Sequence, residues 1–462
     1  MITGKLSPKN LWIKNPIDVL SELDCRGGVV VAEGKIIELV PTGKSPAANV
    51  DAIFDASRLV LLPGLINTHH HFYQTLTRAF SRSLNKELFS WLSTLYPVWA
   101  NLRPYDISIS SQLAMVELLL SGCTTTVDHH YIFSDSLIDA IDIQIQEAKN
   151  LGMRAVFTRG SMSLGKSQGG LPPNYIVQDD QTILDDSTRL IKNYHCINEG
   201  AMTQIALAPC SPFSVSSELM RATAALSCTE GVRLHTHLAE TNDEHEYCQS
   251  RFGLSPLEYL EDVGWLSDRT WLAHGIHFCE REIAALGKER VGISHCASAN
   301  MVLASGICPV VDLENAGCPL GLGVDGSASN DCSNMIQELR LAFLLQRLKY
   351  GASRVSHLDV LRWATNGAAK CIGRSDIGVI AAGMQADFAL FSLDEPRFSG
   401  FEDPIAAIIL CGAHKADHVM IQGRWVVTKG EVIGIDVPKL LRKHSESASQ
   451  LRQIYNDVST HS

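Results

Sequence analysis

The sequence contains no pair of cysteines at C-x-x-C spacing, although it has 13 cysteines in all. Zinc ribbons and thiol redox motifs depend on such closely spaced pairs, so neither is predicted here. Scattered cysteines are compatible with a compartment that keeps thiols reduced. We therefore interpret most of them as reduced, buried side chains and expect a cytoplasmic protein.

Long apolar runs and an excess of basic residues are also absent. No apolar run approaches the roughly 20 residues that a membrane-spanning helix needs, and residues 1–15 lack the apolar centre of a secretory signal. The chain carries 39 Lys and Arg against 50 Asp and Glu, a net charge of −11, and shows no basic cluster. We therefore expect neither a nucleic-acid partner nor a membrane partner.

What the sequence does contain is typical of a globular enzyme. Its 462 residues are 45% hydrophobic and 19% charged, which allows a barrel-sized domain with a large core plus a smaller domain. Between residues 59 and 385, β-branched runs alternate with helical stretches such as 107–120, 184–194 and 217–227, which is typical of βα units around a parallel sheet. Eight candidate strands end near the following residues: His71, His129, Arg159, Cys210, His237, His274, His295 and Asp325.

Eight βα units predict an α/β fold with a (β/α)8 TIM-type barrel over residues 59–385, which we expect to be the catalytic domain. The two ends of the chain, residues 1–58 and 386–462, instead contain short β-type runs between Gly and Pro turns. We expect them to form the N-terminal and C-terminal parts of one small β-sandwich-like domain, with a terminal amphipathic helix at 438–458. Active sites of such barrels lie at the carboxyl ends of the strands, where most of the chemically capable residues fall.

Residues 61–71 read LLPGLINTHHH, a short apolar run that ends in three histidines. A run of this length bounded by Pro and Gly favours a buried strand. Side chains alternate along a strand, so His69 and His71 point the same way and His70 points the opposite way. Two imidazoles on one side of a strand end can share a metal ion, although the pair alone is equally compatible with packed or loop histidines.

Two later strand ends add further candidate ligands. His237 and Glu240 end the β-rich run 235–240 (HTHLAE), and Asp325 ends the run 320–325 (LGLGVD). Neutral imidazoles and a carboxylate suit zinc or iron(II), and three or four protein ligands with an open position are typical of a catalytic site. Agreement among separate strand ends favours a metal site over chance.

With His-x-His, His-x-x-Glu, a lone His and an Asp all at strand ends, the chain resembles the metal-dependent amidohydrolase superfamily. Within it, the chain looks like the aminohydrolase branch, which deaminates purines, pyrimidines and triazines. The resemblance covers essentially the whole chain. The motifs that carry it are PGLINTH at 63–69, AHG at 273–275, SHCASAN at 294–300 and AD at 386–387.

The resemblance implies one divalent metal ion per subunit, with zinc as the first expectation and iron(II) as the alternative. Its expected ligands are His69, His71, His237 and Asp325. Binuclear members carry a bridging lysine at the fourth strand end, where this chain has Cys210, so a single ion is expected. The missing lysine also disfavours a cyclic-amide hydrolase.

The resemblance further implies three catalytic residues. Asp325 would take a proton from the activated water, Glu240 would carry protons to the ring and the leaving amine, and His274 would orient the nucleophile and stabilise the oxyanion. We expect Gln74 and Cys210 to bind substrate, because a carboxamide can read a lactam edge and a small thiol leaves room near the ring. The alternative for Cys210 is a buried small residue without a role in binding.

The expected substrate is 8-oxoguanine, with urate and ammonia as products, because stretches within 69–78, 159–163, 169–173, 208–216 and 323–331 resemble enzymes of that specificity. Some of these stretches are shared with hydroxytriazine aminohydrolases. Isocytosine-type pyrimidines and hydroxytriazines therefore stay open as alternative substrates. A catalytically inactive scaffold is disfavoured because the set of ligands and proton carriers is complete. The expected partners are a small heterocyclic base and further copies of the chain, as a homo-oligomer.

The remaining candidates have structural interpretations. Five histidines are expected to be structural or to orient ligands by hydrogen bonds: His70, His129, His235, His277 and His295. Three aromatic residues could stack on a planar base but are at least as compatible with the core: Trp91, Trp99 and Tyr131. Two residues of an expected helix, His245 and Cys248, are interpreted as surface or packing residues.

Overall fold

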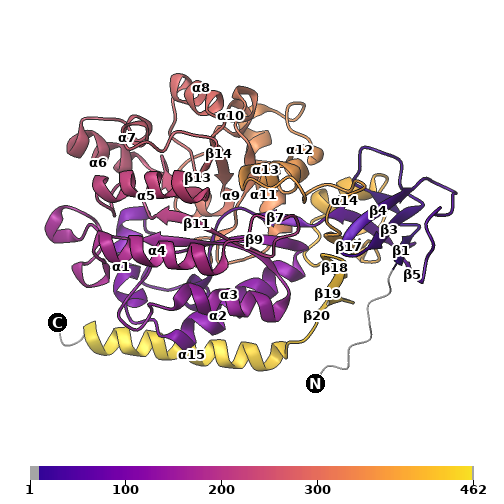
Figure 1. Cartoon of the computed structure of the whole chain (residues 1–462), viewed down its shortest axis with the longest axis horizontal. Coiled ribbons are helices and arrows are strands. Elements are labelled where there is room, and N and C mark those ends of the chain that lie inside the picture. The colour runs from indigo at the N-terminus through magenta and orange to yellow at the C-terminus, as the bar shows by residue number, and fades with distance from the viewer. Residues whose placement is uncertain (1–9, 460–462) are drawn as a thin grey trace.

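A closed barrel of eight parallel strands occupies the centre of the molecule (Figure 1). In the computed structural model, which describes residues 10–459, neighbouring barrel strands follow the chain order and the last strand pairs with the first. This arrangement confirms the predicted (β/α)8 barrel. The strands are β7 (Leu65–Asn67), β9 (Cys123–His130), β10 (Arg154–Ser161), β11 (Thr203–Pro209), β12 (Arg233–Leu238), β13 (Thr270–His274), β14 (Gly292–His295) and β15 (Leu320–Leu322).

Helices connect these strands and surround the barrel (Figure 1). The predicted helical stretches 107–120, 184–194 and 217–227 all lie within observed helices. The helices are α1 (Leu88–Trp99), α2 (Pro104–Leu120), α3 (Ala140–Leu151), α4 (Asp180–Tyr194), α5 (Ser217–Glu230), α6 (Asn242–Phe252), α7 (Pro256–Asp262), α8 (Glu280–Lys288), α9 (Ala297–Val302), α10 (Val310–Ala316), α11 (Met335–Tyr350), α12 (His357–Trp363) and α13 (Asn366–Cys371). Four short 3-10 helices accompany them, η1 (Phe72–Thr77), η2 (Lys166–Gln168), η3 (Asn174–Ile176) and η4 (Pro396–Phe398).

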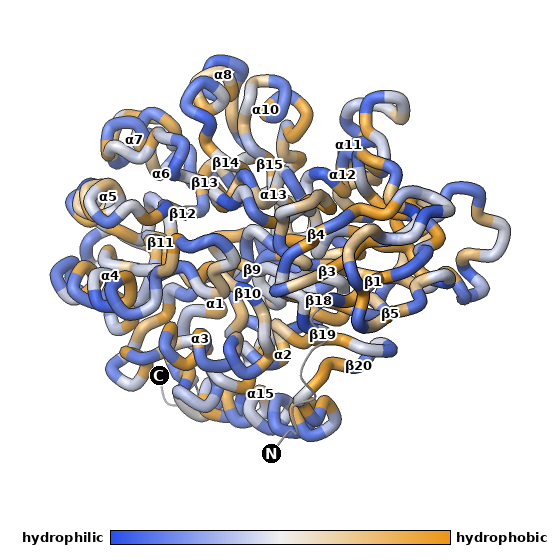
Figure 2. Tube along the Cα trace, turned by 45° about the vertical axis from the view of Figure 1, so that its right-hand side comes forward, coloured by the Kyte–Doolittle hydropathy of each residue, from blue (hydrophilic) through white to orange (hydrophobic). Residues whose placement is uncertain are grey.

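Helix α4 shows why the pattern of the sequence was readable. The Asp179 side chain accepts a hydrogen bond from the backbone N–H of Thr182 and so caps the first turn. Ile183 and Leu190, which lie two turns apart on the same face of the helix, are buried. Figure 2 shows the same alternation of hydrophobic and hydrophilic residues along the other helices around the barrel. Helix α4 therefore packs one face on β10 and β11 and turns the other to solvent.

The two ends of the chain form two β-sheets beside the barrel (Figure 1). The four-stranded sheet comes from the N-terminal end alone, whereas the six-stranded sheet combines both ends. The four strands are β1 (Asn10–Lys14), β3 (Gly28–Ala32), β4 (Lys35–Val40) and β5 (Ala52–Asp55). The six strands are β2 (Asp18–Val19), β6 (Leu59–Pro63), β17 (Phe388–Ser392), β18 (His418–Ile421), β19 (Arg424–Thr428) and β20 (Glu431–Val432).

Side chains from both sheets share one hydrophobic core, as expected of a sandwich. Ile13 and Val29 of the first sheet are fully buried with Phe388 and Leu390 of the second. The extra strands from both chain ends confirm this part of the fold prediction. Residues 1–9 and 460–462 of the predicted end segments lie outside the described residues.

The run predicted as one strand at residues 61–71 is divided among three sheets. Strand β6 pairs antiparallel with β17 in the flanking sheet, β7 lies in the barrel, and β8 (His70–His71) pairs with β16 (Asp325–Gly326). The break between the first two lies at Gly64, where a Cβ atom would lie 2.1 Å from Thr124 Oγ1. Strand pairing thus joins residues 59–63 to the flanking sheets, and the domain boundaries at 58 and 385 stay a prediction.

The C-terminal segment returns to the barrel. Helix α15 (Val437–Ser459), predicted at 438–458, follows α14 (Pro404–Leu410) and strands β18 to β20, and lies along the barrel helices (Figure 1). Leu440 and Leu451 are buried, and His444 Nε2 lies 3.0 Å from Thr75 Oγ1 of η1. Among residues 10–459 no helix is both long and apolar enough to cross a membrane. All 13 cysteines lie in this part of the chain, without a disulfide, and most are buried.

Candidate metal centre

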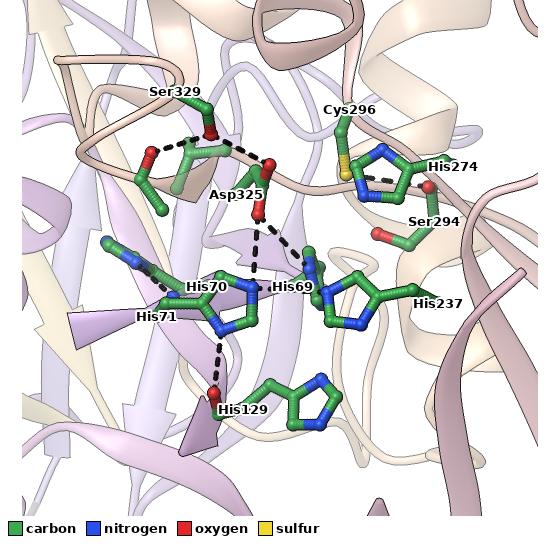
Figure 3. Close-up of polar contacts among 12 residues, drawn as sticks. His69, His70, His71, His129, His237, His274, Ser294, Cys296, Asp325 and Ser329 are labelled. Carbon is green, nitrogen blue, oxygen red and sulfur yellow. Dashed lines mark hydrogen bonds and ion pairs between the residues drawn. The ribbon is translucent and has the colours of Figure 1, made fainter. Parts of the chain in front are cut away.

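A short pair of parallel strands brings together residues that are far apart in sequence. Strand β16 pairs with β8 at the carboxyl end of the barrel, with Asp325 opposite His70. The backbone N–H of Asp325 donates to the carbonyl of His69 at 3.1 Å. Asp325 has φ +61, a left-handed conformation that is strained for a residue with a side chain. The strained turn directs its carboxylate towards the histidines (Figure 3).

The carboxylate and three imidazoles converge in a buried cluster (Figure 3). Asp325 Oδ1 lies 3.2 Å from His69 Nε2 and 3.3 Å from His71 Nε2. His71 Nε2 lies 3.2 Å from His237 Nε2. His70, between the first two ligands in sequence, contacts Ser333 Oγ at 2.9 Å instead. The structure therefore brings the four expected ligands together and turns His70 away, as the strand alternation predicted.

The hydrogen-bond partners of the rings fix where their hydrogens lie. His71 Nδ1 is 2.6 Å from the carbonyl oxygen of His129, and His237 Nδ1 is 2.6 Å from that of Cys210. A carbonyl oxygen only accepts, so each Nδ1 carries a hydrogen and Nε2 is the nitrogen of each ring that a metal ion could reach. The two Nε2 atoms lie 3.2 Å apart and face each other.

His69 has the same tautomer because its Nδ1 bonds a second histidine, His235. His235 Nδ1 donates to the carbonyl of Trp271 at 2.8 Å, so His235 Nε2 accepts from His69 Nδ1 at 2.7 Å. His69 Nε2 is buried and has no hydrogen-bond donor. Burial also lowers the pKa of His69 and His237 well below the usual imidazole value, so both rings are neutral.

The donor set fits a divalent cation. Three neutral nitrogens and one carboxylate oxygen all act as acceptors, and a buried group of acceptors without donors is satisfied by a positive ion. Imidazole and carboxylate ligands suit zinc or iron(II). No lysine stands at the end of β11, where the chain continues into Cys210. The structure thus contains a buried His/Asp site suited to one divalent metal ion.

His129 takes part in the cluster more closely than its sequence position indicated. Its ring stacks on that of His237, with centroids 4.8 Å apart and an interplanar angle of 17°. His129 Nε2 lies 3.0 Å from the carbonyl of Ala208, and Nδ1 is buried without a partner. Two overlapping groups have ligand atoms within 4.8 Å of one another, His69, His71, His129 and His237, and His69, His237, His274 and Asp325.

Glu240 and His274 form a pair next to the cluster. Glu240 follows β12, His274 ends β13, and His274 Nε2 lies 3.5 Å from Glu240 Oε2. His274 Nδ1 is 2.8 Å from Asn300 Oδ1, an amide oxygen that only accepts, so Nδ1 is protonated. Burial raises the pKa of Glu240. Burial opposes a charge on His274, but the carboxylates of Glu240 and Asp325 outweigh it and raise the pKa of His274.

Two supporting residues were missed in the sequence. Asn300 orients His274, and Ser329 Oγ donates to Asp325 Oδ2 at 3.0 Å (Figure 3). Asn300 lies in SHCASAN, a motif that carried the family resemblance, and Ser329 lies in the stretch 323–331, which carried the resemblance in substrate specificity, but no spacing rule distinguishes them from their neighbours. The sequence thus placed both residues within recognisable motifs but did not indicate their roles.

A narrow cavity opens from the cluster between apolar and polar side chains. Gln74 of η1 lines it, and the amide oxygen of Gln74 is buried without a hydrogen-bond partner. Cys210 also lines it, and burial raises the pKa of its thiol to about 12, so the sulfur is neutral. The other lining residues are His71, Leu88, Trp91, Leu92, Tyr131, Ser211, Phe213, His237, Glu240, His274, Leu303, Asp325 and Ser329.

The remaining candidates divide between this cavity and the core. Trp91 and Tyr131 line the cavity, whereas Trp99 is buried and donates through Nε1 to Thr77 Oγ1 at 3.2 Å. Two of the other histidines have partners of their own, since His295 Nε2 contacts Gln346 Nε2 at 3.2 Å and His277 Nε2 contacts the carbonyl of Ser305 at 2.8 Å. On α6, His245 is exposed and Cys248 is buried, in agreement with surface and packing roles.

Known proteins resemble this chain over nearly its whole length. The sequence profile of the amidohydrolase family matches residues 60–426. The 8-oxoguanine deaminase of Pseudomonas aeruginosa is 58% identical over 442 residues, which are 95% of this chain and 98% of the relative. The hydroxydechloroatrazine ethylaminohydrolase of a Pseudomonas species is 34% identical over 458 residues, covering 96% of this chain and 92% of the relative.

A solved structure shows the same similarity in three dimensions. Atrazine chlorohydrolase from Arthrobacter aurescens, crystallised in complex with zinc, superposes with a TM-score of 0.89 at 30% sequence identity. The match covers 95% of this chain and all of the other.

Proposed function

We propose that this chain, which belongs to the amidohydrolase family, is a metal-dependent deaminase that converts 8-oxoguanine and water to urate and ammonia. The observation that carries the proposal is the cluster of four buried acceptors, His69, His71, His237 and Asp325, beside the Glu240–His274 pair. The 58% identity to an 8-oxoguanine deaminase supports the choice of substrate over the hydroxytriazine alternative, for which the identity is 34%.

The four acceptors are proposed to hold one ion, zinc in the first instance. When bound, the ion supplies the charge that makes a water molecule acidic enough to yield hydroxide near neutral pH. Asp325 accepts the proton of that water, while Ser329 Oγ, bonded to Asp325 Oδ2, keeps the carboxylate oriented. The zinc in the related atrazine chlorohydrolase structure supports this choice of metal for the present chain.

Glu240 is proposed to carry protons between the water and the base. Its raised pKa lets the carboxyl group hold a proton that it delivers to a ring nitrogen as the oxygen adds to the amino-bearing carbon. The proton that Asp325 took from the water then passes by way of Glu240 to the amine, the C–N bond breaks and ammonia leaves. The hydroxyl proton of the adduct returns to Glu240 as the C=O bond forms. His274 uses Nδ1 to bond Asn300, and its raised pKa favours a second hydrogen on Nε2, the atom next to Glu240. That Nε2 hydrogen stabilises the negative charge that develops on the attacking oxygen.

Gln74 and Cys210 are proposed to recognise the base. The unpaired amide oxygen of Gln74 can accept a hydrogen bond from a ring N–H, because a buried acceptor without a partner is costly in the free protein. The neutral thiol of Cys210 offers a small, weakly polar surface next to His237. Trp91 and Tyr131 add aromatic surface for a planar ring.

An ammonia-release assay on a panel of bases tests the proposal. The panel contains 8-oxoguanine, guanine, isocytosine, cytosine and hydroxyatrazine, and ultraviolet spectra identify the products. We expect turnover of 8-oxoguanine to exceed that of the other bases and urate to appear. Preferential turnover of isocytosine or hydroxyatrazine would replace the proposed substrate, and the absence of ammonia from every base would reject deamination.

The chain is proposed to work in the cytoplasm as a homo-oligomer on a free base. Thirteen unpaired cysteines support the cytoplasmic location, and the acidic net charge supports a free base over a nucleic acid as substrate. Light scattering coupled to size-exclusion chromatography would give the number of subunits, and a monomeric mass would reject the oligomer.

A further inference from the structure

A buried carboxyl group that the proposed reaction does not use lies directly behind Glu240. Glu244, on α6, is 1% exposed and is not among the residues that line the cavity. Its Oε2 accepts a hydrogen bond from the backbone N–H of Glu240 at 3.0 Å, whereas its Oε1 is buried without a hydrogen-bond partner. Glu244 therefore satisfies the backbone donor of Glu240 at the turn between β12 and α6.

That turn contains an unfavourable backbone conformation. Ala239 has φ +53, in the left-handed region that is unfavourable for a non-glycine residue. Such a conformation persists only where the surroundings hold it, and the hydrogen bond from the backbone of the next residue, Glu240, to Glu244 is one contact that does so. Without this carboxyl group the N–H of Glu240 would be buried without an acceptor, so the turn depends on Glu244.

The same peptide also connects the two proton-handling residues. The carbonyl of Ala239 accepts from the backbone N–H groups of Ile276 and His277, at 2.9 and 3.0 Å, just after His274. The turn that carries Glu240 is thus tied to the turn that carries His274. Their side chains meet at 3.5 Å, a distance that depends on the position of both turns.

We propose that Glu244 is a positioning residue that acts through Glu240: by accepting from the backbone N–H of residue 240, it holds the strained turn that directs the Glu240 carboxyl group to His274 and the cavity. The proposal rests on the proposed deaminase function for its kinetic consequence, but the physical link between Glu244 and the turn does not. Misplacement of a reacting group by about 1 Å can cost roughly 100-fold in rate.

Two substitutions separate the acceptor from the bulk of the side chain. Glu244→Gln keeps an oxygen acceptor at the same length, whereas Glu244→Ala removes it. With 8-oxoguanine we expect Glu244→Ala to lower kcat by roughly 10- to 100-fold with little change in KM and with the metal retained, and Glu244→Gln to recover most of the loss. Glu246→Ala, which removes an exposed carboxylate from the same helix, serves as the matched control.

Unchanged kcat in Glu244→Ala would overturn the proposal, and so would equal impairment of Glu244→Gln and Glu244→Ala. Loss of metal in proportion to activity would also overturn it, because the effect would then not pass through Glu240. In the Glu240→Gln background, Glu244→Ala should reduce kcat by no more than about twofold further, since two residues acting through one group are not additive. If Glu244→Ala lowered kcat in this background by as much as it does in the wild type, Glu244 would not act through Glu240.

Hydrogen exchange gives a readout that does not require turnover. By mass spectrometry, the peptide spanning residues 238–242 should exchange faster in Glu244→Ala than in the wild type, Glu244→Gln and Glu246→Ala. Equal exchange in all four proteins would overturn the physical link itself. If the wild type deaminates none of the bases, the proposed function fails, while this measurement still decides whether Glu244 holds the turn.

Discussion

At the scale of single residues, the positions of the imidazole hydrogens decide what the cluster can bind. His69, His71 and His237 each donate through Nδ1, so each turns an Nε2 lone pair inwards. Backbone carbonyls of His129 and Cys210 and the ring of His235 accept these hydrogens. We therefore expect these orienting groups to be as necessary to the site as the proposed ligands.

His237→Ala removes one of these lone pairs without adding a competing group. We expect the purified variant to lose most of its bound metal and its deaminase activity, because three acceptors hold the ion less tightly than four. Elemental analysis and the ammonia assay measure the two losses. His245→Ala, at an exposed histidine of α6, is the matched control; full metal occupancy with normal turnover in His237→Ala would remove His237 from the ligand set.

Glu240→Gln separates proton transfer from metal binding. The amide keeps the shape of the side chain but cannot exchange a proton at neutral pH, so we expect kcat to fall by about 100- to 10,000-fold while the metal stays bound. Steady-state kinetics with elemental analysis checks this, with the surface variant Glu246→Gln as control. Turnover within a factor of two or so of the wild type would mean that another group carries the proton.

Gly326→Ala tests the role of Gln74 in substrate binding without replacing Gln74 itself. A Cβ atom at residue 326 would lie 1.8 Å from Gln74 Oε1, so the flexible amide must move away. We expect KM for 8-oxoguanine to rise about tenfold, the scale of one hydrogen bond, with unchanged metal content. In a double variant, Gln74→Ala should abolish the effect of Gly326→Ala; an independent further loss would show that the glycine acts elsewhere.

At the scale of elements, the strands and helices were easier to predict than the connections between them. Local sequence patterns predicted stretches within α2, α4, α5 and α15, since such patterns depend on neighbouring residues. The pairing of β8 with β16 was not predictable, because it joins residues 70 and 325 through two-residue strands that have no pattern of their own. The predicted strand at 61–71 was divided for the same reason, since each part finds a partner distant in sequence.

The candidate site was predictable in its ligands but not in its supports. The predicted family is confirmed, and the motifs of that family contained His69, His71, His237 and Asp325. The roles of Asn300 and Ser329 emerge only when the loops after β14 and β15 fold over the strand ends. Hydrogen bonds between such loops depend on backbone conformation, which the sequence does not specify residue by residue.

The docking of α15 on the barrel should depend on pH through His444. Burial lowers the pKa of His444 to about 4, from 6.5 in an exposed imidazole. Between these values the unfolded chain binds a proton that the folded chain does not, so the free energy of unfolding falls as the pH falls from about 6.5 to 4. The contribution of this one group is at most about 3 kcal/mol.

His444→Gln should therefore flatten the dependence of stability on pH over that window. The glutamine amide can still reach Thr75, and it does not titrate. Chemical denaturation of both proteins at pH 4 to 7.5 measures the difference between their curves. A difference that does not change with pH would contradict the role assigned to His444.

At the scale of the whole molecule, the metal site lies where the barrel strands and their loops converge, so metal content should affect global stability. Without an ion, three nitrogen lone pairs and a carboxylate oxygen remain buried together. A ligand that binds only the folded state contributes about 3 kcal/mol when its free concentration is about 100 times Kd. Loss of the ion removes that contribution.

Removal of the metal with 1,10-phenanthroline should therefore abolish turnover and lower Tm by several degrees. Addition of zinc or iron(II) to the metal-free protein should restore both turnover and Tm. The metal that restores more of each is the preferred one. Calorimetry and the ammonia assay follow the two recoveries. Full activity at a metal content near zero would reject the metal centre.

The pairing of β6 with β17 has a consequence for the synthesis of the protein. The whole barrel separates these strands in the sequence, so the ribosome releases β6 long before its partner. At a translation rate of roughly 5–20 residues per second, one edge of β6 stays unpaired for on the order of tens of seconds. Nascent chains stalled before residue 388 would thus carry a folded or folding barrel beside an incomplete sandwich, and would be the species that chaperones encounter.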